Sequence, residues 1–358
     1  MERRQFLQSS SLGVAAAATS AFSSLLSAPV AAAAPAAATA PAAGHQRPLA
    51  EVRGKVAFIT GGSSGIGLGL AQACSEAGMR VIFTYLNEAH RDEALTHFKP
   101  GNAGVHTLKL DVTDRDAMQR AADEAERVFG RVHLLCNNAG IGLRTPAKDA
   151  SYKDWDWGLG VNLGGVVNGL VTFLPRMRAH GEGAHVLTTG SSASLVAGNV
   201  GVYVTSKFAV MGLMESLRDE LDGQNIGISI FCPGLVKSNI AASERNRPAE
   251  LRVDGAPTPP AETAAQMQEF MRRFAEVGME PLEAGRLVLA GVQHNDLYIL
   301  SHGEFRNVMR ERAEALMASL PSAPPPPARA ALTRTYTTTI YARERDWRLK
   351  ERAPARKT

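Results

Sequence analysis

Short apolar runs alternate with amphipathic stretches along most of the chain. Each run is four to seven residues long and is followed by a turn or by a helical pattern. The expected strands are residues 56–60, 80–85, 105–110, 132–136, 184–190, 226–231 and 297–300. Alternation of strand and helix favours a parallel sheet covered by helices on both faces. The pattern therefore predicts a single α/β domain with a doubly wound, Rossmann-type parallel sheet.

The first 45 residues lack this pattern. Arg3 and Arg4 precede Phe6, Leu7 and an uncharged Ala-rich stretch with several prolines. This arrangement is similar to a twin-arginine export signal followed by an Ala/Pro-rich leader, with a disordered leader as the alternative. The prolines argue against a permanent membrane helix, and we expect no other stretch to span a bilayer. Residues 1–45 are excluded from the fold, and the protein is expected to be exported, periplasmic or secreted.

The composition changes again after residue 320. Residues 321–358 include four consecutive prolines and carry nine Lys or Arg against three Asp or Glu. Such a segment is typical of a Pro-rich linker and a solvated basic tail, with a partner-binding arm as the alternative. The folded domain is therefore expected over residues 53–320. Within it, the polar, proline-containing stretch 239–278 is expected to form a substrate lid.

Charge and cysteine content exclude some functions. The formal net charge is only +4, and the basic residues gather at the C-terminus, so no nucleic-acid partner is expected. Cys74, Cys136 and Cys232 each lie in or beside an apolar run, which indicates buried thiols rather than a disulfide framework. No metal site is expected.

The first strand runs into a glycine-rich turn and then into a helix expected to end near residue 77. The spacing is Gly-x-x-x-Gly-x-Gly. Glycines allow the backbone to approach a pyrophosphate closely, and a helix N-terminus offers N–H groups and the positive end of the helix dipole. A loop without a cofactor is the alternative. The residues expected to form this dinucleotide cradle are Gly61, Ser63, Ser64, Gly65, Ile66 and Gly67.

The end of the second strand bears on the choice of cofactor. A carboxylate at this point would hydrogen-bond the adenosine ribose and favour NAD. The chain instead has Tyr85, Leu86 and Asn87. We therefore expect Tyr85 beside the ribose and NADP as the preferred cofactor, with NAD as the alternative. Arg91 or Ser63 is the candidate for contact with a 2′-phosphate.

Tyr203 and Lys207 stand four residues apart, so they share one face if this stretch is helical. Tyrosine has an ordinary pKa of about 10 and is a poor base at neutral pH. An ammonium about 4 Å away, at an effective dielectric constant of roughly 20, stabilises the phenolate by about 4 kcal/mol. Lys207 is thus expected to lower the pKa of Tyr203 and to create an acid-base site. A surface helix with coincidental spacing is the alternative.

Three motifs occur together and in order: Thr60-Gly61-x-x-x-Gly65-x-Gly67, Asn137-Asn138-Ala139-Gly140 and Tyr203-x-x-x-Lys207. On these motifs the chain resembles a short-chain dehydrogenase/reductase over about residues 53–320. The resemblance implies an NAD(P)-dependent oxidoreductase that interconverts a small-molecule alcohol and a carbonyl compound. Relatives commonly form dimers or tetramers, so a homo-oligomer is expected.

The resemblance also implies roles for single residues. Asp111, followed by Val112, would meet the adenine ring, and Asn137 would hold the central strands near the cofactor. Asn162 would hold a water molecule in a proton relay. The remaining residues expected to contact the cofactor are Asn138, Ala139, Gly140, Pro233, Gly234, Val236 and Ser238, of which the last four would wrap the nicotinamide. His302 is expected to have a capping or interface role.

The serine that would orient the substrate is harder to place. In most relatives it stands thirteen residues before the tyrosine, and this count lands on Gly190. A one-residue deletion in the following loop restores Ser191 while keeping the strand in register, so Ser191 is preferred. Ser192 and, more distantly, Ser194 are the alternatives.

The resemblance thus predicts a division of work among four residues. Tyr203 would donate a proton to the carbonyl oxygen, and Ser191 would polarise that oxygen. Lys207 would hold the nicotinamide ribose and lower the pKa of Tyr203, while Asn162 would carry the water. A cofactor-holding sensor or scaffold on the same fold is the main alternative, and an isomerase or dehalogenase is a second.

Overall fold

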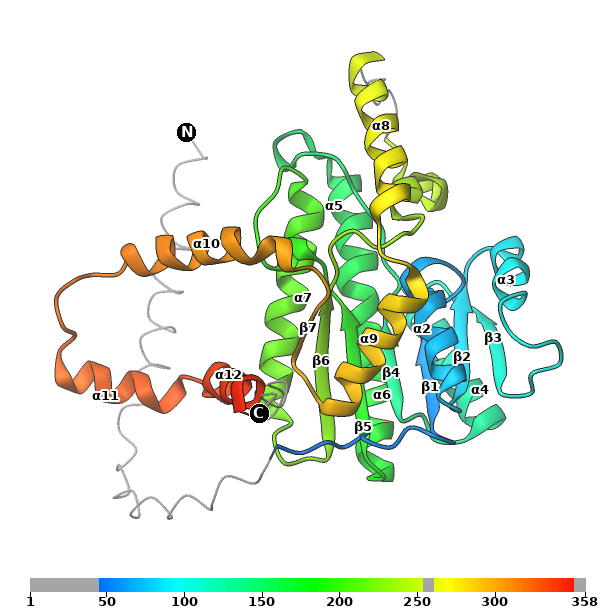
Figure 1. Cartoon of the computed structure of the whole chain (residues 1–358), viewed down its shortest axis with the longest axis horizontal. Helices are drawn as coiled ribbons and strands as arrows, with labels where there is room; N and C mark the ends of the chain where they lie inside the picture. Colours follow the sequence, from blue (N-terminus) through cyan, green and yellow to red (C-terminus); the bar gives the residue numbers. More distant parts are fainter. Residues whose placement is uncertain (1–44, 254–260, 351–358) are drawn as a thin grey trace, which may run out of the picture. The chain divides into compact units, whose positions relative to one another are not determined.

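The computed structural model describes residues 45–253 and 261–350. Its centre is a sheet of seven parallel strands in the order β3-β2-β1-β4-β5-β6-β7 (Figure 1). The strands are β1 (Val56–Ile59), β2 (Arg80–Tyr85), β3 (Val105–Lys109), β4 (Leu134–Asn137), β5 (Ala184–Thr189), β6 (Ile226–Cys232) and β7 (Tyr298–Leu300). The predicted doubly wound α/β fold is confirmed, and every predicted strand is present.

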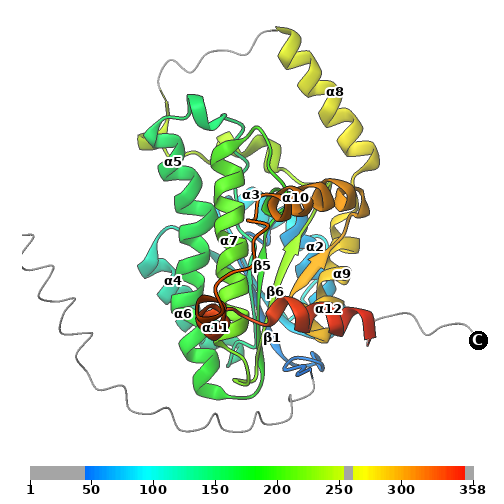
Figure 2. The ribbon, with the colours of Figure 1, turned by 90° about the vertical axis from the view of Figure 1, so that its left-hand side faces the viewer.

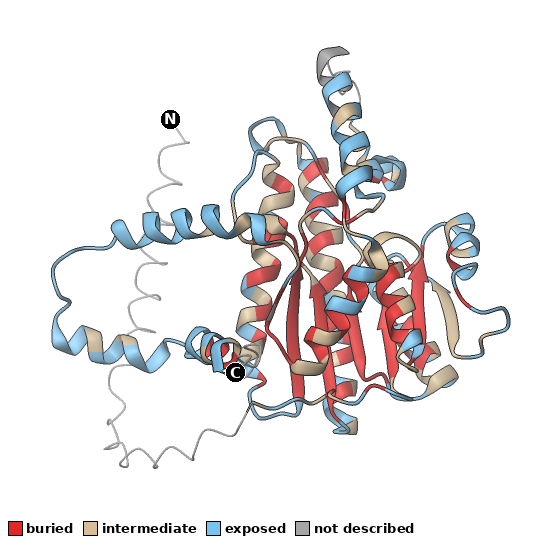
Figure 3. Cartoon of the chain, viewed as in Figure 1, coloured by how far each residue is buried: buried red, intermediate tan, exposed pale blue. Residues whose placement is uncertain are grey.

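Helices cover both faces of this sheet. They are α2 (Gly65–Glu76), α3 (Glu88–Leu95), α4 (Arg115–Phe129), α5 (Tyr152–Leu159), α6 (Gly165–His180), α7 (Gly201–Glu220), α8 (Ala261–Val277), α9 (Pro281–His294), α10 (Arg306–Ala318), α11 (Pro327–Tyr336) and α12 (Ile340–Lys350). One core cluster joins the sheet to α4, α6 and α7, and the other joins it to α2 and α9. Because both faces are covered, the central strands are buried along their length (Figure 3).

The helices α2 and α9 cross at two glycines. A Cβ on Gly69 would lie 1.9 Å from the carbonyl oxygen of Pro281, and one on Gly285 would lie 2.2 Å from the carbonyl oxygen of Gly69. The two backbones are therefore in direct contact, which only glycine permits. This crossing supports the helix that follows the glycine-rich turn.

One continuous helical run joins α5 to α6 through a π-helical turn at Gly160–Gly164. By length and composition the run Tyr152–His180 could cross a membrane, with a mean hydropathy of 1.3 over its most apolar window. Sequence reasoning expected no such stretch. Half of that window is buried inside the fold, however, as in the core helix of a soluble domain.

The domain begins earlier than predicted. Leu49 and Val52 are buried and belong to the core cluster on the α2 and α9 side. Described residues before 53 therefore pack into the domain that was predicted to begin there. The predicted export signal and most of the leader, residues 1–44, lie outside the described residues.

The predicted lid divides into two described parts. The first contains the short helical turns η4 (Ile240–Asn246) and η5 (Ala249–Leu251), and the second is α8. Shorter turns elsewhere are η1 (Ala147–Asp149), η3 (Ser192–Ser194) and η6 (Gly303–Phe305). In α8, Phe270 and Val277 are exposed.

The expectation of a solvated tail is wrong for α12. Ile340, Glu344 and Trp347 are buried, although no residue of α10 or α11 is. Figure 2 shows these three helices on the side of the domain that faces the viewer. The Trp347 ring stacks on His45 with 3.8 Å between ring centroids. A tail rich in charge was expected to stay in water, but two apolar side chains and one paired carboxylate suffice to dock this helix.

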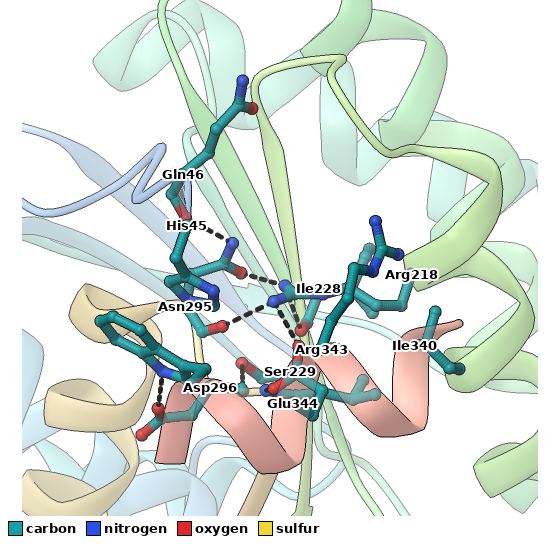
Figure 4. Close-up of polar contacts among 12 residues, drawn as sticks. His45, Gln46, Arg218, Ile228, Ser229, Asn295, Asp296, Ile340, Arg343 and Glu344 are labelled. Carbon is teal, nitrogen blue, oxygen red and sulfur yellow. Dashed lines mark hydrogen bonds and ion pairs between the residues drawn. The ribbon is translucent and has the colours of Figure 1, made fainter. Parts of the chain in front are cut away.

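The paired carboxylate belongs to Glu344 (Figure 4). One of its oxygens accepts a hydrogen bond from Arg218 of α7 at 2.6 Å, and the other accepts from the Leu297 N–H at 3.1 Å. The same guanidinium donates to the Asn295 carbonyl oxygen at 3.0 Å. Trp347 Nε1 donates to Asp296 at 3.0 Å. The C-terminal helix thus completes the polar network beside the edge strand β7.

Candidate active site

A cavity of about 390 Å³ opens where the carboxyl ends of the central strands meet the loops that follow them. The loops after β1, β2, β3, β4, β5 and β6 all contribute lining residues. In a parallel α/β sheet, this edge is the position where ligands bind. The cavity therefore lies where the sequence motifs were expected to converge.

The glycine-rich turn after β1 is shaped as a cradle. Gly61 and Gly65 have φ of +64° and +53°, a region that side chains with a Cβ rarely adopt. A Cβ on Gly65 would lie 2.8 Å from Ser238 Cβ, and one on Gly67 would lie 2.4 Å from Asn138 Nδ2. Ser64 precedes α2 and forms no side-chain cap, so its side chain leaves the first N–H groups of the helix open to other partners. A dinucleotide pyrophosphate fits this cradle.

All six residues predicted for the cradle line the cavity, namely Gly61, Ser63, Ser64, Gly65, Ile66 and Gly67. A fourth glycine of this turn, Gly62, was missed. A Cβ on Gly62 would lie 2.5 Å from Phe83 Cβ, so Gly62 is needed to seat the turn on β2. The Gly61-Gly62 pair in the sequence was the available signal.

Tyr85 lies at the end of β2 and lines the cavity. Its hydroxyl accepts a hydrogen bond from Arg91 at 3.0 Å, and the Arg91 guanidinium lies 5.1 Å from the ring centroid. Arg91 also pairs with Asp92 at 2.8 Å. His90 and Asn87 line this end of the cavity, and sequence reasoning gave neither of them a role. The cavity wall at this end therefore carries a phenol, an imidazole and an amide but no carboxylate from β2.

Asp111 and Val112, after β3, both line the cavity. The Asp111 carboxylate accepts hydrogen bonds from the backbone N–H and the hydroxyl of Thr113, at 2.9 and 2.8 Å. It therefore closes a local turn as well as facing the cavity.

The residue that joins the central strands is Asn138, and the prediction of Asn137 is wrong. Asn138 Nδ2 donates to the carbonyl oxygens of Thr60 and Gly61, at 3.1 and 3.2 Å, and its Oδ1 accepts from Thr189 at 3.0 Å. It thereby ties the ends of β1, β4 and β5. Asn137 points into the core, where neither of its amide atoms has a hydrogen-bond partner among the described residues.

Tyr203 and Lys207 line the cavity, and Ser191 lies beside Tyr203 without being part of the lining. Tyr203 and Lys207 lie on one face of α7, with Lys207 Nζ 5.7 Å from the Tyr203 ring centroid. Ser191, just past β5, lies close enough to Tyr203 for its hydroxyl to oppose the rise in the pKa of the phenol. Lys207 Nζ donates to the Thr189 carbonyl oxygen at 2.9 Å. The phenol, the hydroxyl and the ammonium thus form one contiguous polar group.

The expected lowering of the Tyr203 pKa is not what this structure shows. Burial raises the pKa of Tyr203, the hydrogen bond from Ser191 opposes this rise, and Cys232 adds to it. Burial also lowers the pKa of Lys207 to about 8. The sequence estimate omitted desolvation, which disfavours the charged form of both groups and exceeds their mutual attraction at this distance.

The serine lies where strand register places it. The Gly190 N–H donates to Phe231 O at 2.7 Å and so extends the β5–β6 ladder by one residue. Gly190, the residue thirteen before Tyr203, has no side chain to offer. Ser191 follows it, and its hydroxyl also accepts from the Ala193 N–H at 3.1 Å. Of the three candidate serines, Ser191 is the one whose side chain influences the pKa of Tyr203.

Asn162 lies in the π-helical turn between α5 and α6 and is buried. Its amide exchanges two hydrogen bonds with the Ile141 backbone, at 2.8 and 3.0 Å, and donates to Ser206 at 3.2 Å. The side chain therefore fixes the loop after β4 against α7. Because the Asn162 amide is engaged in these hydrogen bonds, we expect a bound water molecule to contact the backbone of the π-turn instead. Such turns are common at functional sites.

The segment after β6 contributes in part as predicted. Pro233 and Ser238 line the cavity, as do Asn138, Ala139 and Gly140 from the loop after β4. Gly234 and Val236 do not. The Gly234 N–H donates to His302 Nδ1 at 3.2 Å, and Val236 is buried and bridges to Met279. The His302 ring thus holds the backbone of this segment at Gly234.

The substrate side of the cavity was only partly predicted. Its wall is formed by the first part of the lid, as expected, but also by α5, which sequence reasoning left without such a role. Spacing alone does not tell which lid or helix residues face inward. The lining residues there are Asp156, Trp157, Ile240, Arg245, Asn246, Pro248, Glu250 and Leu251.

Comparison with known proteins agrees with this geometry. The family model for short chain dehydrogenases matches residues 55–249. A C alpha-dehydrogenase of Sphingobium sp. is 36% identical over 268 residues, which cover 74% of this chain and 86% of that protein. A D-threitol dehydrogenase of Mycolicibacterium smegmatis is 35% identical over 188 residues, covering 52% and 72%. The crystal structure of a short chain dehydrogenase/reductase from Burkholderia phymatum in complex with NAD is 34% identical, with a TM-score of 0.71 and coverage of 77% and 99%.

Proposed function

This chain belongs to the short-chain dehydrogenase family and is an NAD(P)-dependent oxidoreductase, and on that premise we propose that Tyr203, Ser191, Lys207 and Asn162 form its active site. The observation that carries the proposal is that Tyr203 and Lys207 line the same cavity as the glycine cradle, with Lys207 Nζ 5.7 Å from the Tyr203 ring centroid. Ser191 lies close enough to the phenol to oppose the rise in its pKa. A nicotinamide bound there supplies or takes up the hydride. The reaction is the interconversion of an alcohol and a carbonyl compound.

Tyr203 and Ser191 act on the substrate oxygen. In the direction of reduction, the phenol donates its proton to the carbonyl oxygen, which the Ser191 hydroxyl also hydrogen-bonds. Because burial raises the Tyr203 pKa, the phenol is protonated at neutral pH and ready to donate. In the direction of oxidation, the same phenolate oxygen would take the proton back.

Lys207 and Asn162 hold this arrangement. The Lys207 ammonium lies above Tyr203 and stabilises negative charge that develops on the phenol oxygen. Asn162 fixes the loop at Ile141 and Ser206 of α7, one residue before Lys207. A water carried near Asn162 would return the proton to Tyr203.

The direct test is the variant Tyr203→Phe. The ring is kept and only the hydroxyl is lost, so turnover should fall by at least about a hundredfold to ten-thousandfold, the usual contribution of a positioned acid or base. Affinity for the cofactor should change by less than about twofold, because the cradle is untouched. Oxidation of cyclohexanol, sec-butanol and sec-phenethyl alcohol would be followed by absorbance of the reduced nicotinamide. Substantial turnover by the variant would refute the assignment.

We further propose that NADP is preferred over NAD. The support is the absence of a β2 carboxylate at Tyr85, Leu86 and Asn87, together with His90 in the wall and Arg91 bound to Tyr85. Fluorescence titration with NADPH and NADH should give the lower Kd for NADPH. Exchanging Asn87 for Asp should reverse the order, since a carboxylate repels the 2′-phosphate. Equal Kd values for the two cofactors would count against the preference.

A cofactor-holding sensor is the less favoured alternative, because the related proteins are named as dehydrogenases. Tight NADPH binding without oxidation of any alcohol or reduction of any carbonyl compound would favour the sensor instead. An isomerase or dehalogenase would form product without net change in the cofactor.

We propose a homo-oligomer from the apolar side chains of α6 that remain exposed. Val167 and Val171 are 40% and 64% exposed on a helix that otherwise packs on the sheet. Light scattering of the purified protein should report a dimer or larger species, and Val171→Glu should shift it toward the monomer. A wild-type monomer at micromolar concentration would contradict this.

We also propose export through the twin-arginine route, on the basis of Arg3 and Arg4. Replacing both with Lys in the full chain should retain the protein in the cytoplasm of a bacterial host. Cell fractionation and immunoblotting would measure this, and unchanged export of the variant would exclude the route.

A further inference from the structure

One buried arginine connects the lid to the helix that lines the cavity. Arg247 follows η4 and is only 8% exposed. Its neighbours Asn246 and Pro248 line the cavity, whereas Arg247 itself does not. Its side chain therefore turns away from the cavity, toward α5.

The partner of Arg247 is Asp154, in the first turn of α5. The guanidinium donates to Asp154 Oδ1, and both side chains are 7% exposed. Asp154 Oδ2 accepts from the N–H and the hydroxyl of Ser151, at 2.9 and 2.7 Å, and so caps the helix. Burial alone would raise the pKa of Asp154, but the hydrogen bonds from Arg247 and Ser151 lower it below its ordinary value. One ionised carboxylate thus holds both the start of α5 and the lid.

The same guanidinium stacks on Trp157, one helical turn further along α5. Arg247 Cζ lies 4.6 Å from the Trp157 ring centroid. Trp157 lines the cavity and packs in a small cluster with Ile141, Leu143 and Val202. Val202 precedes Tyr203, and the backbone of Ile141 binds the Asn162 amide. A displacement of Trp157 would therefore reach both the substrate wall and the residues around Tyr203.

Two weaker contacts hold the lid on either side of this point. The Gly142 N–H donates to Ser243 Oγ at 2.9 Å, and Lys153 Nζ donates to the Arg252 carbonyl oxygen at 2.7 Å. Of the three attachments, the Arg247–Asp154 pair is the one in which both members are buried and charged. Breaking such a pair leaves an uncompensated buried charge. The Arg247–Asp154 pair should therefore determine whether this part of the lid stays closed.

We propose that Arg247 is a positioning residue that clamps residues 240–252 onto α5 and so fixes Trp157 as the substrate-side wall of the active site. The proposal rests on the proposed function of that site. A planar guanidinium can pair with a carboxylate and stack on an indole at once, which an ammonium cannot do in the same geometry. Lysine should therefore be a poor substitute at this position.

The test compares Arg247→Met, Arg247→Lys and the double variant Arg247→Met/Asp154→Asn in the full chain. Hydrogen exchange should become about tenfold faster or more in residues 240–252 and at the Gly142 amide of Arg247→Met, and stay unchanged in α4. The Kd for NADPH should stay within about twofold. The KM for whichever of cyclohexanol, sec-butanol or sec-phenethyl alcohol is oxidised fastest should rise by about tenfold to a hundredfold, because a misplaced wall costs orientation.

The double variant keeps the claim falsifiable if Arg247→Met is poorly folded. Asparagine still accepts from Ser151 and carries no charge, so the double variant should regain folding but not the low KM. Glu244→Gln is the matched control, because Glu244 reaches Arg247 Nε only at 3.6 Å and is 66% exposed. It should leave exchange and KM unchanged.

Hydrogen-exchange rates in Arg247→Met equal to those of the wild type would overturn the proposed clamp. A rise in the Kd for NADPH as large as the rise in KM would also overturn it. The exchange measurement needs no substrate. If no alcohol is oxidised, the proposed function fails while the clamp is still decided.

Discussion

Two adjacent asparagines at the end of β4 act on opposite sides of the sheet. Asn137, the last residue of the strand, faces the core, and Asn138, one residue later, faces the loops around the cavity. Successive side chains of a strand alternate in direction, so a shift of one residue exchanges the two roles. The motif could be located from the sequence, but its register against β1 and β5 could not.

Lys207 is required by the proposed reaction, but its burial is expected to lower the stability of the fold. Its pKa is lowered from 10.5 to about 8 by burial. Below about pH 8 it is charged in both the folded and the unfolded chain, so the cost of burying the charge is fully present. Between about pH 8 and 10.5 the folded protein loses this proton first, the unfolded chain binds more protons, and stability rises with pH.

Lys207→Met should therefore raise the free energy of unfolding at pH 7 by up to about 3 kcal/mol, less the lost hydrogen bond to Thr189. The gain should shrink toward zero as the pH approaches 10.5, while turnover is lost at every pH. Urea unfolding of variant and wild type side by side would measure this, with the exposed Lys109→Met as control. A gain that grew with pH would contradict the argument.

At the scale of elements, the alternation of apolar runs was enough to place every strand to within about two residues. The run of Gly, Ser and Ile after β1 also identified the cradle. Three features could not be read in this way. The wall formed by α5, the inward residues of the lid and the docking of α12 all depend on contacts between segments far apart in sequence. Hydrophobic periodicity carries no information on such contacts.

The crossing of α2 and α9 makes a prediction at this scale. Gly69→Ala would force a methyl group against the Pro281 carbonyl oxygen and separate the two helices. We expect a loss of about 1–3 kcal/mol in the free energy of unfolding, the usual cost of overpacking. Because α2 begins in the cradle, the Kd for NADPH should rise as well.

Gly212→Ala is the matched control, because nothing lies within 4 Å of a Cβ at that helical position. It should be neutral or stabilising by up to about 1 kcal/mol, since alanine favours helix over glycine. The urea midpoint of Gly69→Ala should lie below that of the wild type, and the urea midpoint of Gly212→Ala should equal or exceed it. Equal midpoints would show that the helices can move apart without loss.

At the scale of the whole molecule, the domain is closed by its last described helix. Arg218 of α7 and Glu344 of α12 form a buried pair, and Ile340 belongs to the same core cluster as β5 and β6. Surface pairs such as Arg343 with Asp219 and Asp222 add little, because they are exposed. The boundary at residue 320, read from composition, therefore divides a unit that folds together.

A chain ending at Leu320 should accordingly be less stable than the full chain by about 3–5 kcal/mol, since the burial of Ile340 and Trp347 and the pairing of Arg218 with Glu344 would all be lost. A chain that ends at Lys350 retains α12 and is the control. Thermal unfolding followed by circular dichroism would compare the three. A wild-type Tm for the chain ending at Leu320 would restore the solvated-tail interpretation.

The stacking of His45 on Trp347 bears on the timing of folding during synthesis. These rings lie 302 positions apart in the chain, an interval that a ribosome covers in roughly 15 to 60 s at about 5–20 residues per second. Until α12 is made, Arg218, Asn295 and the start of the domain lack the helix that completes their network. The nascent chain can therefore assemble its nucleotide cradle long before the domain is completed. The segment that precedes His45 is attached to a domain that is complete only when α12 has emerged.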